Sequence, residues 1–266
     1  MIPKTIHYCW FGASKPSPFI RQCMATWRDK LPHYTLREWN ESNFDVDSVP
    51  FVRDAYAAGK WAFVADYVRL HALYTEGGIY LDTDVKILRP LDNFLHYNLF
   101  GSHELHPDFY SDKEQLRRLA PDGTTNDPDL FVDHFGVHSA LVGSVADLPY
   151  LRECLEYYRT LRFDPTNHPI EEYIIGRHIS RIMTKYGYRY CDEDQLLDDN
   201  MMIFNSSLFV GNTLYLTPRA YSIHLCNGSW CESCNTLDYK LRNNLPRLTP
   251  LWSMLAKIRR RICYHK

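Results

Sequence analysis

The sequence predicts an α/β fold, and three observations support this. Strand-like and helix-like segments alternate along most of the 266 residues, which is the order that places helices on the faces of a sheet. Short apolar runs end in glycine turns or acidic residues, as in "KTIHYCWFG" (4–12) and "GGIYLDTDVKIL" (77–88). Longer segments with apolar residues at helical spacing separate them. We therefore expect a mainly parallel sheet flanked by helices.

Each element follows from local signals. Pro18 favours a helix start, and the Gly77–Gly78 pair favours a helix stop before the next strand. The predicted helices cover 19–31, 49–59, 60–78, 149–161 and 170–187. The predicted strands cover 4–12, 34–40, 79–84, 85–89, 98–104, 136–144, 214–218 and 221–225.

The composition excludes several classes of protein. Hydrophobic residues make up 45% of the chain, enough for a sizeable core, and the net charge of −2 argues against general nucleic-acid binding. The opening "MIPKTIHYCWFG" has no signal-peptide pattern, and no apolar run is long enough to span a bilayer. We therefore expect a cytoplasmic protein whose eight cysteines are reduced thiols.

The chain divides into a main domain over 1–235 and a helical, basic tail over 236–266. Residues 106–134 are polar and rich in turn formers, which indicates a surface excursion from the main domain. The tail has apolar residues at helical spacing followed by three arginines (Trp252, Leu255, Ile258, Arg259, Arg260 and Arg261). Such a segment is either a peripheral contact with an anionic membrane or a solvated terminal helix.

Asp82 and Asp84 stand two positions apart at the end of the apolar run "GGIYL". In an open α/β sheet, ligands bind beyond the carboxyl ends of the strands. Side chains at i and i+2 of an extended segment point the same way, so two carboxylates there repel each other unless a cation lies between them. Oxygen ligands of this kind suit Mg²⁺ or Mn²⁺, which also bind phosphate oxygens. The spacing therefore indicates a metal–diphosphate site, with a solvated acidic turn as the alternative.

Asp66 and Arg69 lie three positions apart on a largely apolar helix, so they share one face. An acid–base pair in "AFVADYVRLHALY" is either an ion pair at the helix surface or part of a ligand site. In a site, Asp66 would accept hydrogen bonds from sugar hydroxyls, and the guanidinium of Arg69 would donate to hydroxyls or phosphate.

The string "AFVADYVRLHALYTEGGIYLDTDV" resembles the core signature of glycosyltransferases with a DXD sugar-binding motif. This family includes fungal Golgi mannosyltransferases and bacterial capsule and lipopolysaccharide enzymes, and is distantly similar to large glucosylating toxins. The segments "IPKTIHYCWFG", "YTLREWNESNFD" and "YSIHLCNGSW" also resemble the family, in the expected order. The resemblance implies a GT-A fold, with a Rossmann-like sheet that binds a nucleotide sugar.

The resemblance also implies roles for individual residues. Trp10 would stack on the nucleotide base. Asp66, Arg69 and Tyr80 would line the donor-sugar pocket. Asp82 and Asp84 would hold Mn²⁺ or Mg²⁺, with Asn227 or Ser229 completing the metal shell. Trp230 would reach the glycosidic oxygen from a closing loop.

Two segments depart from the family pattern. The family often has an asparagine-containing strand where this chain has "FGVHSALVGS", with His138 and Ser139. The segment "HLCNGSWCESC" is rich in cysteine, and Cys226, Cys231 and Cys234 would be either a zinc site or idle thiols. His224 in the same segment is either a ligand or an ordinary strand histidine.

The expected function is a metal-dependent, retaining glycosyltransferase. It would move a hexose from a nucleotide sugar, UDP-linked rather than GDP-linked, to a glycan or lipid-linked acceptor in capsule or lipopolysaccharide synthesis. No residue stands out as a covalent nucleophile, which fits a front-face mechanism in which the leaving phosphate assists the acceptor hydroxyl. The alternatives are a non-catalytic nucleotide-sugar-binding scaffold and a metal-dependent phosphohydrolase.

Overall fold

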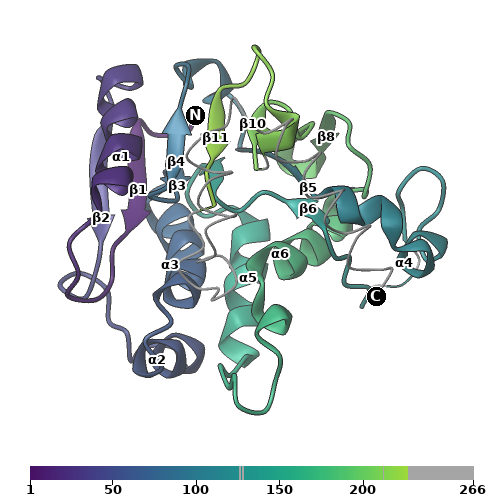
Figure 1. The fold of residues 1–266 in the computed structure, drawn as a ribbon, viewed down its shortest axis with the longest axis horizontal. Coiled ribbons are helices and arrows are strands. Elements are labelled where there is room, and N and C mark those ends of the chain that lie inside the picture. The colour runs from purple at the N-terminus through teal and green to yellow at the C-terminus, as the bar shows by residue number, and fades with distance from the viewer. Residues whose placement is uncertain (126, 128, 212, 227–266) are drawn as a thin grey trace, which may run out of the picture.

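The computed structural model describes residues 1–226 except 126, 128 and 212. This part of the chain forms an eight-stranded sheet with helices packed against it, and a three-stranded sheet beside it (Figure 1). The α/β class predicted from the alternation of elements is therefore confirmed. Among the described residues, no helix is long and apolar enough to cross a bilayer.

The large sheet is mixed. Its strands are β1 (Thr5–Cys9), β2 (Thr35–Trp39), β3 (Gly78–Leu81), β5 (Leu99–Leu105), β6 (Phe135–Val137), β7 (Leu141–Ser144), β8 (Gln195–Leu197) and β9 (Met201–Phe204). The order is β2-β1-β3-β7-β5-β9-β8, with β6 paired to β5 off this path. The small sheet has the order β10-β11-β4, formed by β10 (Phe209–Val210), β11 (Ser222–His224) and β4 (Val85–Ile87).

The expectation of a mainly parallel sheet is wrong. Strand β1 is parallel to β2 and β3, and β5 is parallel to β9, but β7 runs antiparallel to both β3 and β5. A parallel neighbour requires a crossover of a dozen or more residues. Here β6 folds back against β5 as an antiparallel partner, and only residues 138–140 separate β6 from β7. Strand β7 therefore runs in the opposite direction to its neighbours β3 and β5.

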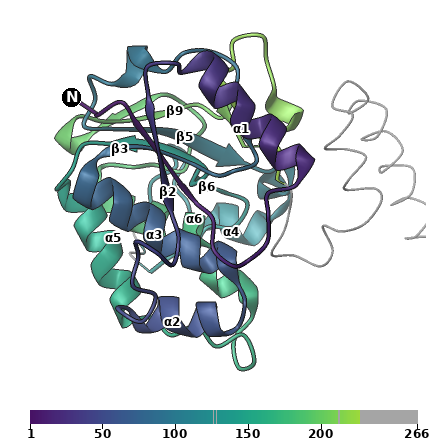
Figure 2. The same cartoon turned by 90° about the vertical axis from the view of Figure 1, so that its left-hand side faces the viewer.

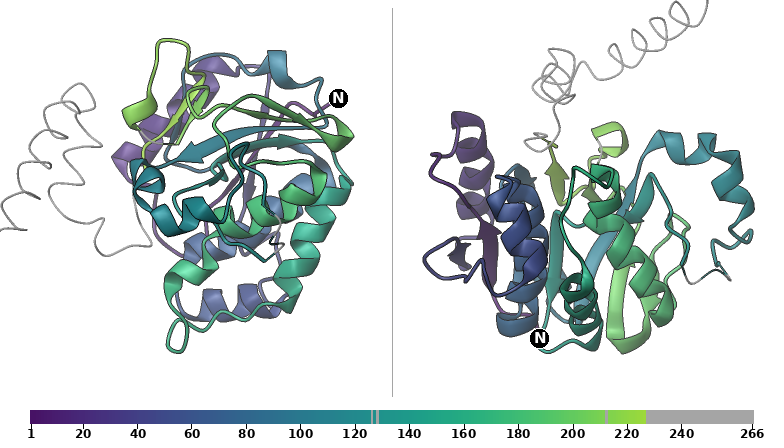
Figure 3. Two further views of the ribbon diagram at one scale, coloured as in Figure 1. Left: turned by 90° about the vertical axis from the view of Figure 1, so that its right-hand side faces the viewer. Right: turned by 90° about the horizontal axis from the view of Figure 1, so that it is seen from below.

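The helices form layers on both sides of the large sheet. Helix α3 packs against β1, β3 and β7, whereas α1 lies on the opposite side and contacts β4 (Figure 2). Helices α5 and α6 contact each other, and α5 also contacts α3 (Figure 3). The helices are α1 (Pro18–Lys30), α2 (Pro50–Ala57), α3 (Trp61–Glu76), α4 (Lys113–Arg117), α5 (Pro149–Thr160) and α6 (Ile175–Met183).

Backbone conformation and close packing both require glycine at positions 77 and 78. Gly77 ends α3 with a φ of 64°, and Gly78 continues with a φ of 116°, both in the region that favours glycine. A β-carbon on Gly78 would lie 2.7 Å from the carbonyl oxygen of Thr5 and 2.8 Å from Nε2 of His7. The two glycines therefore turn the chain from α3 directly into β3 beside β1. As a result, Asp82 and Asp84 lie just beyond the carboxyl end of β3.

Several element boundaries differ from the sequence-based prediction. The strand expected over 136–144 is two strands, β6 and β7, and the helix expected over 170–187 is interrupted, with α6 flanked by 3₁₀ turns. The strand expected over 214–218 is wrong, because Thr213–Tyr215 forms a 3₁₀ turn. Strands β8, β9 and β10 were not predicted, because each is only 2–4 residues long and lacks a clear alternating pattern.

The polar segment 106–134 connects β5 to β6 and contains the short helix α4. Salt bridges join it to α6, from Arg177 to Asp133 at 3.0 Å and from Arg181 to Asp129 at 3.0 Å. The predicted division at residue 235 and the tail over 236–266 lie outside the described residues.

Candidate active site

Asp82 and Asp84 lie in the tight turn that joins β3 to β4. The backbone N–H of Asp82 donates to the carbonyl of Ala140 at 2.9 Å, and the N–H of Val85 donates to the carbonyl of Asp82 at 2.9 Å. The turn is therefore fixed to the neighbouring strand region. Both side chains remain partly accessible, with exposed fractions of 23% for Asp82 and 14% for Asp84. The predicted position at the carboxyl end of a buried strand is what the structure shows.

Arg69 lies behind Asp82 and contacts four oxygen-bearing groups, one of which is the carbonyl of Ala65, to which its Nε donates at 3.4 Å. Its Nη2 donates to Oδ1 of Asp66 at 2.8 Å and lies 3.3 Å from Oδ1 of Asp82, while its Nη1 donates to the carbonyl of Ser139 at 2.8 Å. The side chains of Arg69 and Asp66 are only 6% and 9% exposed. The pair that the sequence placed on one helix face is therefore a buried ion pair directed at the DXD turn.

Tyr80 belongs to the same network. Its hydroxyl donates to Oδ1 of Asp82 at 2.9 Å, and the guanidinium of Arg69 lies 4.7 Å from the centre of its ring. A cation over an aromatic face is stabilised by the ring quadrupole, more so when both are shielded from water. Tyr80 therefore holds Asp82 and Arg69 in fixed positions from within the core. Its place in a donor-sugar pocket stays a prediction.

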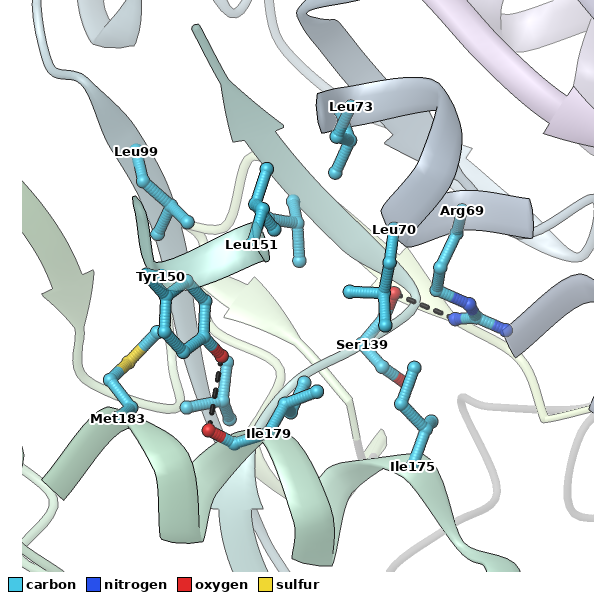
Figure 4. A pocket seen from close by; sticks show the side chains of 12 residues that line it. Arg69, Leu70, Leu73, Leu99, Ser139, Tyr150, Leu151, Ile175, Ile179 and Met183 are labelled. Atoms are coloured by element: carbon cyan, nitrogen blue, oxygen red, sulfur yellow. Dashed lines mark hydrogen bonds between the residues drawn. The ribbon is translucent and has the colours of Figure 1, made fainter. Parts of the chain in front are cut away.

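Burial sets the electrostatics of this network. Burial raises the pKa of Asp66 to about 7, with Arg69 opposing that rise and Asp82 adding to it. Below Arg69 the interior is apolar and contains a cavity of about 10 Å³, lined by residues such as Leu70, Leu73 and Ile175 (Figure 4). This surrounding excludes water from one side of the guanidinium, so its interactions with the carboxylates are weakly screened.

His224 faces Asp84 from the small sheet. Strand β11 pairs antiparallel with β4, which places His224 opposite Val85, and the N–H of Leu225 donates to the carbonyl of Asp84 at 3.2 Å. Nε2 of His224 lies 3.2 Å from Oδ1 of Asp84. Burial alone would lower the pKa of His224, but Cys226 and Asp84 beside it raise that pKa well above its usual value. One ligand atom each from Asp82, Asp84 and His224 lie within 4.8 Å of one another.

Glu104 and His138 extend the site beyond His224. Glu104 is near the end of β5 and His138 directly follows β6, and one ligand atom each from Glu104, His138 and His224 also lie within 4.8 Å of one another. Burial raises the pKa of Glu104 and, with the charges of His224 and Arg69, lowers that of His138 well below its usual value. Glu104 was not singled out from the sequence. Its position at the end of the predicted strand 98–104 was the available signal.

Trp10 directly follows β1, which is the parallel neighbour of β3 in the sheet. It therefore lies at the same end of the sheet as the DXD turn. Its side chain is half-buried, and its indole N–H donates to the carbonyl of Ser14 at 2.7 Å. The side chain is thus tied to the loop after β1. Its predicted role in stacking on a nucleotide base stays a prediction.

The remaining predicted site residues lie outside the described residues. These are Asn227 and Ser229 as metal ligands, Trp230 near the glycosidic oxygen, and Cys231 and Cys234 of the cysteine-rich segment. Among the described residues, Cys9, Cys23, Cys154 and Cys191 are free thiols.

An acidic turn at a strand end, backed by a buried Arg–Asp pair, offers oxygen ligands for a divalent cation. Residues 18–100 match the family model described as "Glycosyltransferase sugar-binding region containing DXD motif". This match spans α1 to β5 and includes Asp66, Arg69, Tyr80, Asp82 and Asp84. It confirms the resemblance found in the sequence, and with the α/β sheet it supports the predicted GT-A glycosyltransferase class.

Two curated fungal relatives are named as mannosyltransferases. The chain is 30% identical over 155 residues to inositol phosphoceramide mannosyltransferase 3 of Schizosaccharomyces pombe, which covers 56% of this chain and 37% of the relative. It is 28% identical over 128 residues to subversion of eukaryotic traffic protein A of Legionella pneumophila, covering 38% of this chain and 19% of the relative. The matched regions thus span less than half the length of these relatives.

Two solved structures are similar to this chain with TM-scores below 0.5. The PaToxG glycosyltransferase matches with a TM-score of 0.48 and 14% identity, over 69% of each chain. The galactosyltransferase LgtC, solved with donor and acceptor sugar analogues, matches with a TM-score of 0.42 and 13% identity, over 94% of this chain and 95% of its own.

Proposed function

We propose that this chain is a metal-dependent glycosyltransferase that moves a hexose from a nucleoside-diphosphate sugar to a glycan or lipid-linked acceptor. The observation that carries the proposal is the pair of partly exposed carboxylates, Asp82 and Asp84, fixed in one turn against a buried Arg69–Asp66 pair. A solvated acidic turn has no need of a buried guanidinium behind it. The match of residues 18–100 to a DXD sugar-binding region supports the same reading.

The donor set fits a hard divalent cation. Asp82 and Asp84 offer carboxylate oxygens, the ligands that Mn²⁺ and Mg²⁺ take together with phosphate oxygens. A bound divalent cation would neutralise the negative charge that develops on the departing nucleoside diphosphate. Arg69 and Tyr80 keep the Asp82 carboxylate in place, which is preorganisation of the kind that lowers the barrier of a charge-separating step.

Asp66 and Arg69 are proposed to hold the donor sugar at the inner end of this turn. Trp10 is proposed to stack on the base, and Asn227 or Ser229 to complete the shell of the cation. Trp230 is proposed to donate its indole N–H toward the glycosidic oxygen. Retention of configuration by a front-face mechanism, a UDP-linked donor and a place in capsule or lipopolysaccharide synthesis are carried over from the resemblance as part of the proposal.

Two further parts of the proposal concern the setting of the reaction. The matched fungal relatives are named as mannosyltransferases that act on inositol phosphoceramide, a lipid. A lipid-linked acceptor is therefore included in the proposal for this chain. The basic tail over 236–266 is proposed to make peripheral contact with the inner face of the cytoplasmic membrane, where such an acceptor would lie.

A thermal-shift screen of UDP-linked and GDP-linked hexoses, each with and without Mn²⁺, tests the donor and the metal together. A ligand that binds only the native state raises the melting temperature. We expect a shift that requires both Mn²⁺ and one nucleotide sugar, and transfer of that sugar to an acceptor. Equal shifts with and without Mn²⁺ would contradict the proposed metal dependence.

Turnover assays then separate transfer from the other activities. Release of nucleoside diphosphate that an acceptor does not increase would favour a phosphohydrolase, and binding without release would favour a scaffold. Replacing Trp230 by Ala is expected to slow transfer more than it weakens nucleotide binding. An equal loss of both would assign Trp230 a packing role.

A further inference from the structure

Glu104, His138 and His224 form a cluster that the proposed transfer reaction does not use. They come from three separate segments, the end of β5, the residue after β6 and the end of β11. One ligand atom from each lies within 4.8 Å of the other two. From this geometry we infer that the chain carries a second metal site, selective for a zinc-type ion, directly beside the DXD turn.

The spacing of the two imidazoles matches that of neighbouring zinc ligands. Nε2 of His138 lies 3.4 Å from Nδ1 of His224. That separation is longer than an ordinary hydrogen bond to nitrogen, which is about 2.7–3.2 Å. Two ligands of a tetrahedral zinc ion, each about 2.0–2.3 Å from the metal, lie about 3.3–3.8 Å apart. The rings are therefore placed as ligands of one ion are placed.

The Glu104 carboxylate supplies the third ligand. The Glu104 carboxylate lies near the charged groups of His224, Asp82 and Arg69. No group among the described residues donates a hydrogen bond to it. Glu104 is half-buried, and a carboxylate partly withdrawn from water is stabilised when it is paired or bound to a metal. Two histidines and one glutamate are the ligand set of a class of zinc sites that keep a fourth position for another ligand. Sγ of Cys226, 3.4 Å from Nδ1 of His224, is close enough to occupy that position after a small movement.

The packing around the cluster also favours a defined site. A β-carbon on Gly211 would lie 3.0 Å from Cγ of Glu104 and 3.2 Å from Cδ2 of His138. Glycine at this position lets the backbone close over both side chains. His138 is fully buried, so its ring has no access to solvent.

The second nitrogen of His224 links the two sites. Nε2 lies 3.2 Å from Oδ1 of Asp84. Metal-bound histidines commonly donate their other ring N–H to a carboxylate, which fixes the orientation of both groups. Zinc on Nδ1 would thus leave Nε2–H to hold Asp84 in place for the DXD cation. This inference does not depend on glycosyl transfer, because it concerns metal content alone.

The test uses the purified full chain, stripped with a chelator, reloaded with Zn²⁺, dialysed and analysed for metal by mass spectrometry. We expect one zinc per chain in the wild type and in the matched control Asp82→Asn, which lies outside the cluster. In Glu104→Gln, which keeps the size of the side chain, we expect at least a tenfold weaker zinc affinity in competition with a chromophoric chelator. Circular dichroism checks that each variant is folded.

Co²⁺ gives a second measurement that does not depend on stability. In the tetrahedral site it should show intense visible absorption, which Glu104→Gln weakens and Asp82→Asn leaves unchanged. Zinc retained in full by Glu104→Gln would overturn the inference. Zinc lost from Asp82→Asn as from Glu104→Gln would also overturn it, by placing the ion on the DXD turn with Nε2 of His224 as a ligand.

Discussion

The two sides of the candidate site are built in different ways. On the Asp82 side, Arg69, Tyr80 and Asp66 all lie within 17 positions of one another in "DYVRLHALYTEGGIYLD" and form a closed network of short contacts. On the His224 side, Glu104, His138 and His224 come from distant parts of the chain and approach without short hydrogen bonds between them. The first side is preassembled by its own charges, whereas the second is positioned by strand pairing and would be joined by the proposed zinc ion.

The largest expected effect comes from breaking the charge network on the Asp82 side. Arg69→Met should lower the free energy of unfolding by about 3–5 kcal/mol, because it leaves the buried Asp66 carboxylate without its partner. Urea denaturation of the folded variant measures this. The double variant Arg69→Met with Asp66→Asn is the control and should regain part of the loss. No recovery in the double variant would show that the cost is one of packing alone.

Removing one carboxylate of the turn should affect catalysis more than folding. Asp84→Asn keeps the shape of the side chain but removes the negative charge of one proposed ligand of the cation. We therefore expect turnover to fall about 100–1000-fold. The melting temperature without nucleotide should fall less than turnover does, because asparagine keeps an oxygen that can accept a hydrogen bond from Nε2 of His224. Initial-rate assays at saturating Mn²⁺ provide the measurement. Unchanged turnover would remove Asp84 from the site.

A milder change tests how tightly the Asp82 side is organised. Tyr80→Phe removes the hydroxyl that donates to Asp82 but keeps the ring beneath Arg69. A hydrogen bond to a charged group contributes about 1.5–3 kcal/mol, so turnover should fall about 10–150-fold. A full loss of turnover in Tyr80→Phe would mean that the hydroxyl takes part in the reaction directly.

The smallest effect expected is a change in pH dependence. Because the pKa of Asp66 rises to about 7 on folding, the native state binds more protons than the unfolded state between about pH 4 and pH 7. The contribution of Asp66 to stability should therefore fall as pH rises through this window. Asp66→Asn should flatten that part of the profile, which denaturation at several pH values measures. An identical slope in the variant would contradict the raised pKa.

The same contrast explains what the sequence could predict. Helical spacing was enough to place Asp66 and Arg69 on one helix face, whereas their grouping with Tyr80 and Asp82 was implied by the family resemblance. The approach of His224 to Asp84 depends on the pairing of β11 with β4, which no local pattern encodes. Glu104 and His138 were missed as site members for the same reason.

The sheet shows a similar limit. Alternation of elements predicted the α/β class, but the direction of β7 depends on how β6 folds back on β5, a contact between residues 30 or more positions apart. Hydrophobic periodicity carries the identity of an element and not its direction in the sheet. Very short strands such as β10, with two residues, offer too few positions for a period to show.

The central claim is that the Asp82–Asp84 turn binds a divalent cation together with a nucleoside diphosphate. Electron paramagnetic resonance of free Mn²⁺ measures it directly, by titrating the wild type and Asp84→Asn in the presence of UDP or GDP with Zn²⁺ already bound. We predict that the wild type removes about one equivalent of Mn²⁺ from solution only when nucleotide is present, and that Asp84→Asn does not. Equal uptake of Mn²⁺ by both proteins would contradict the account.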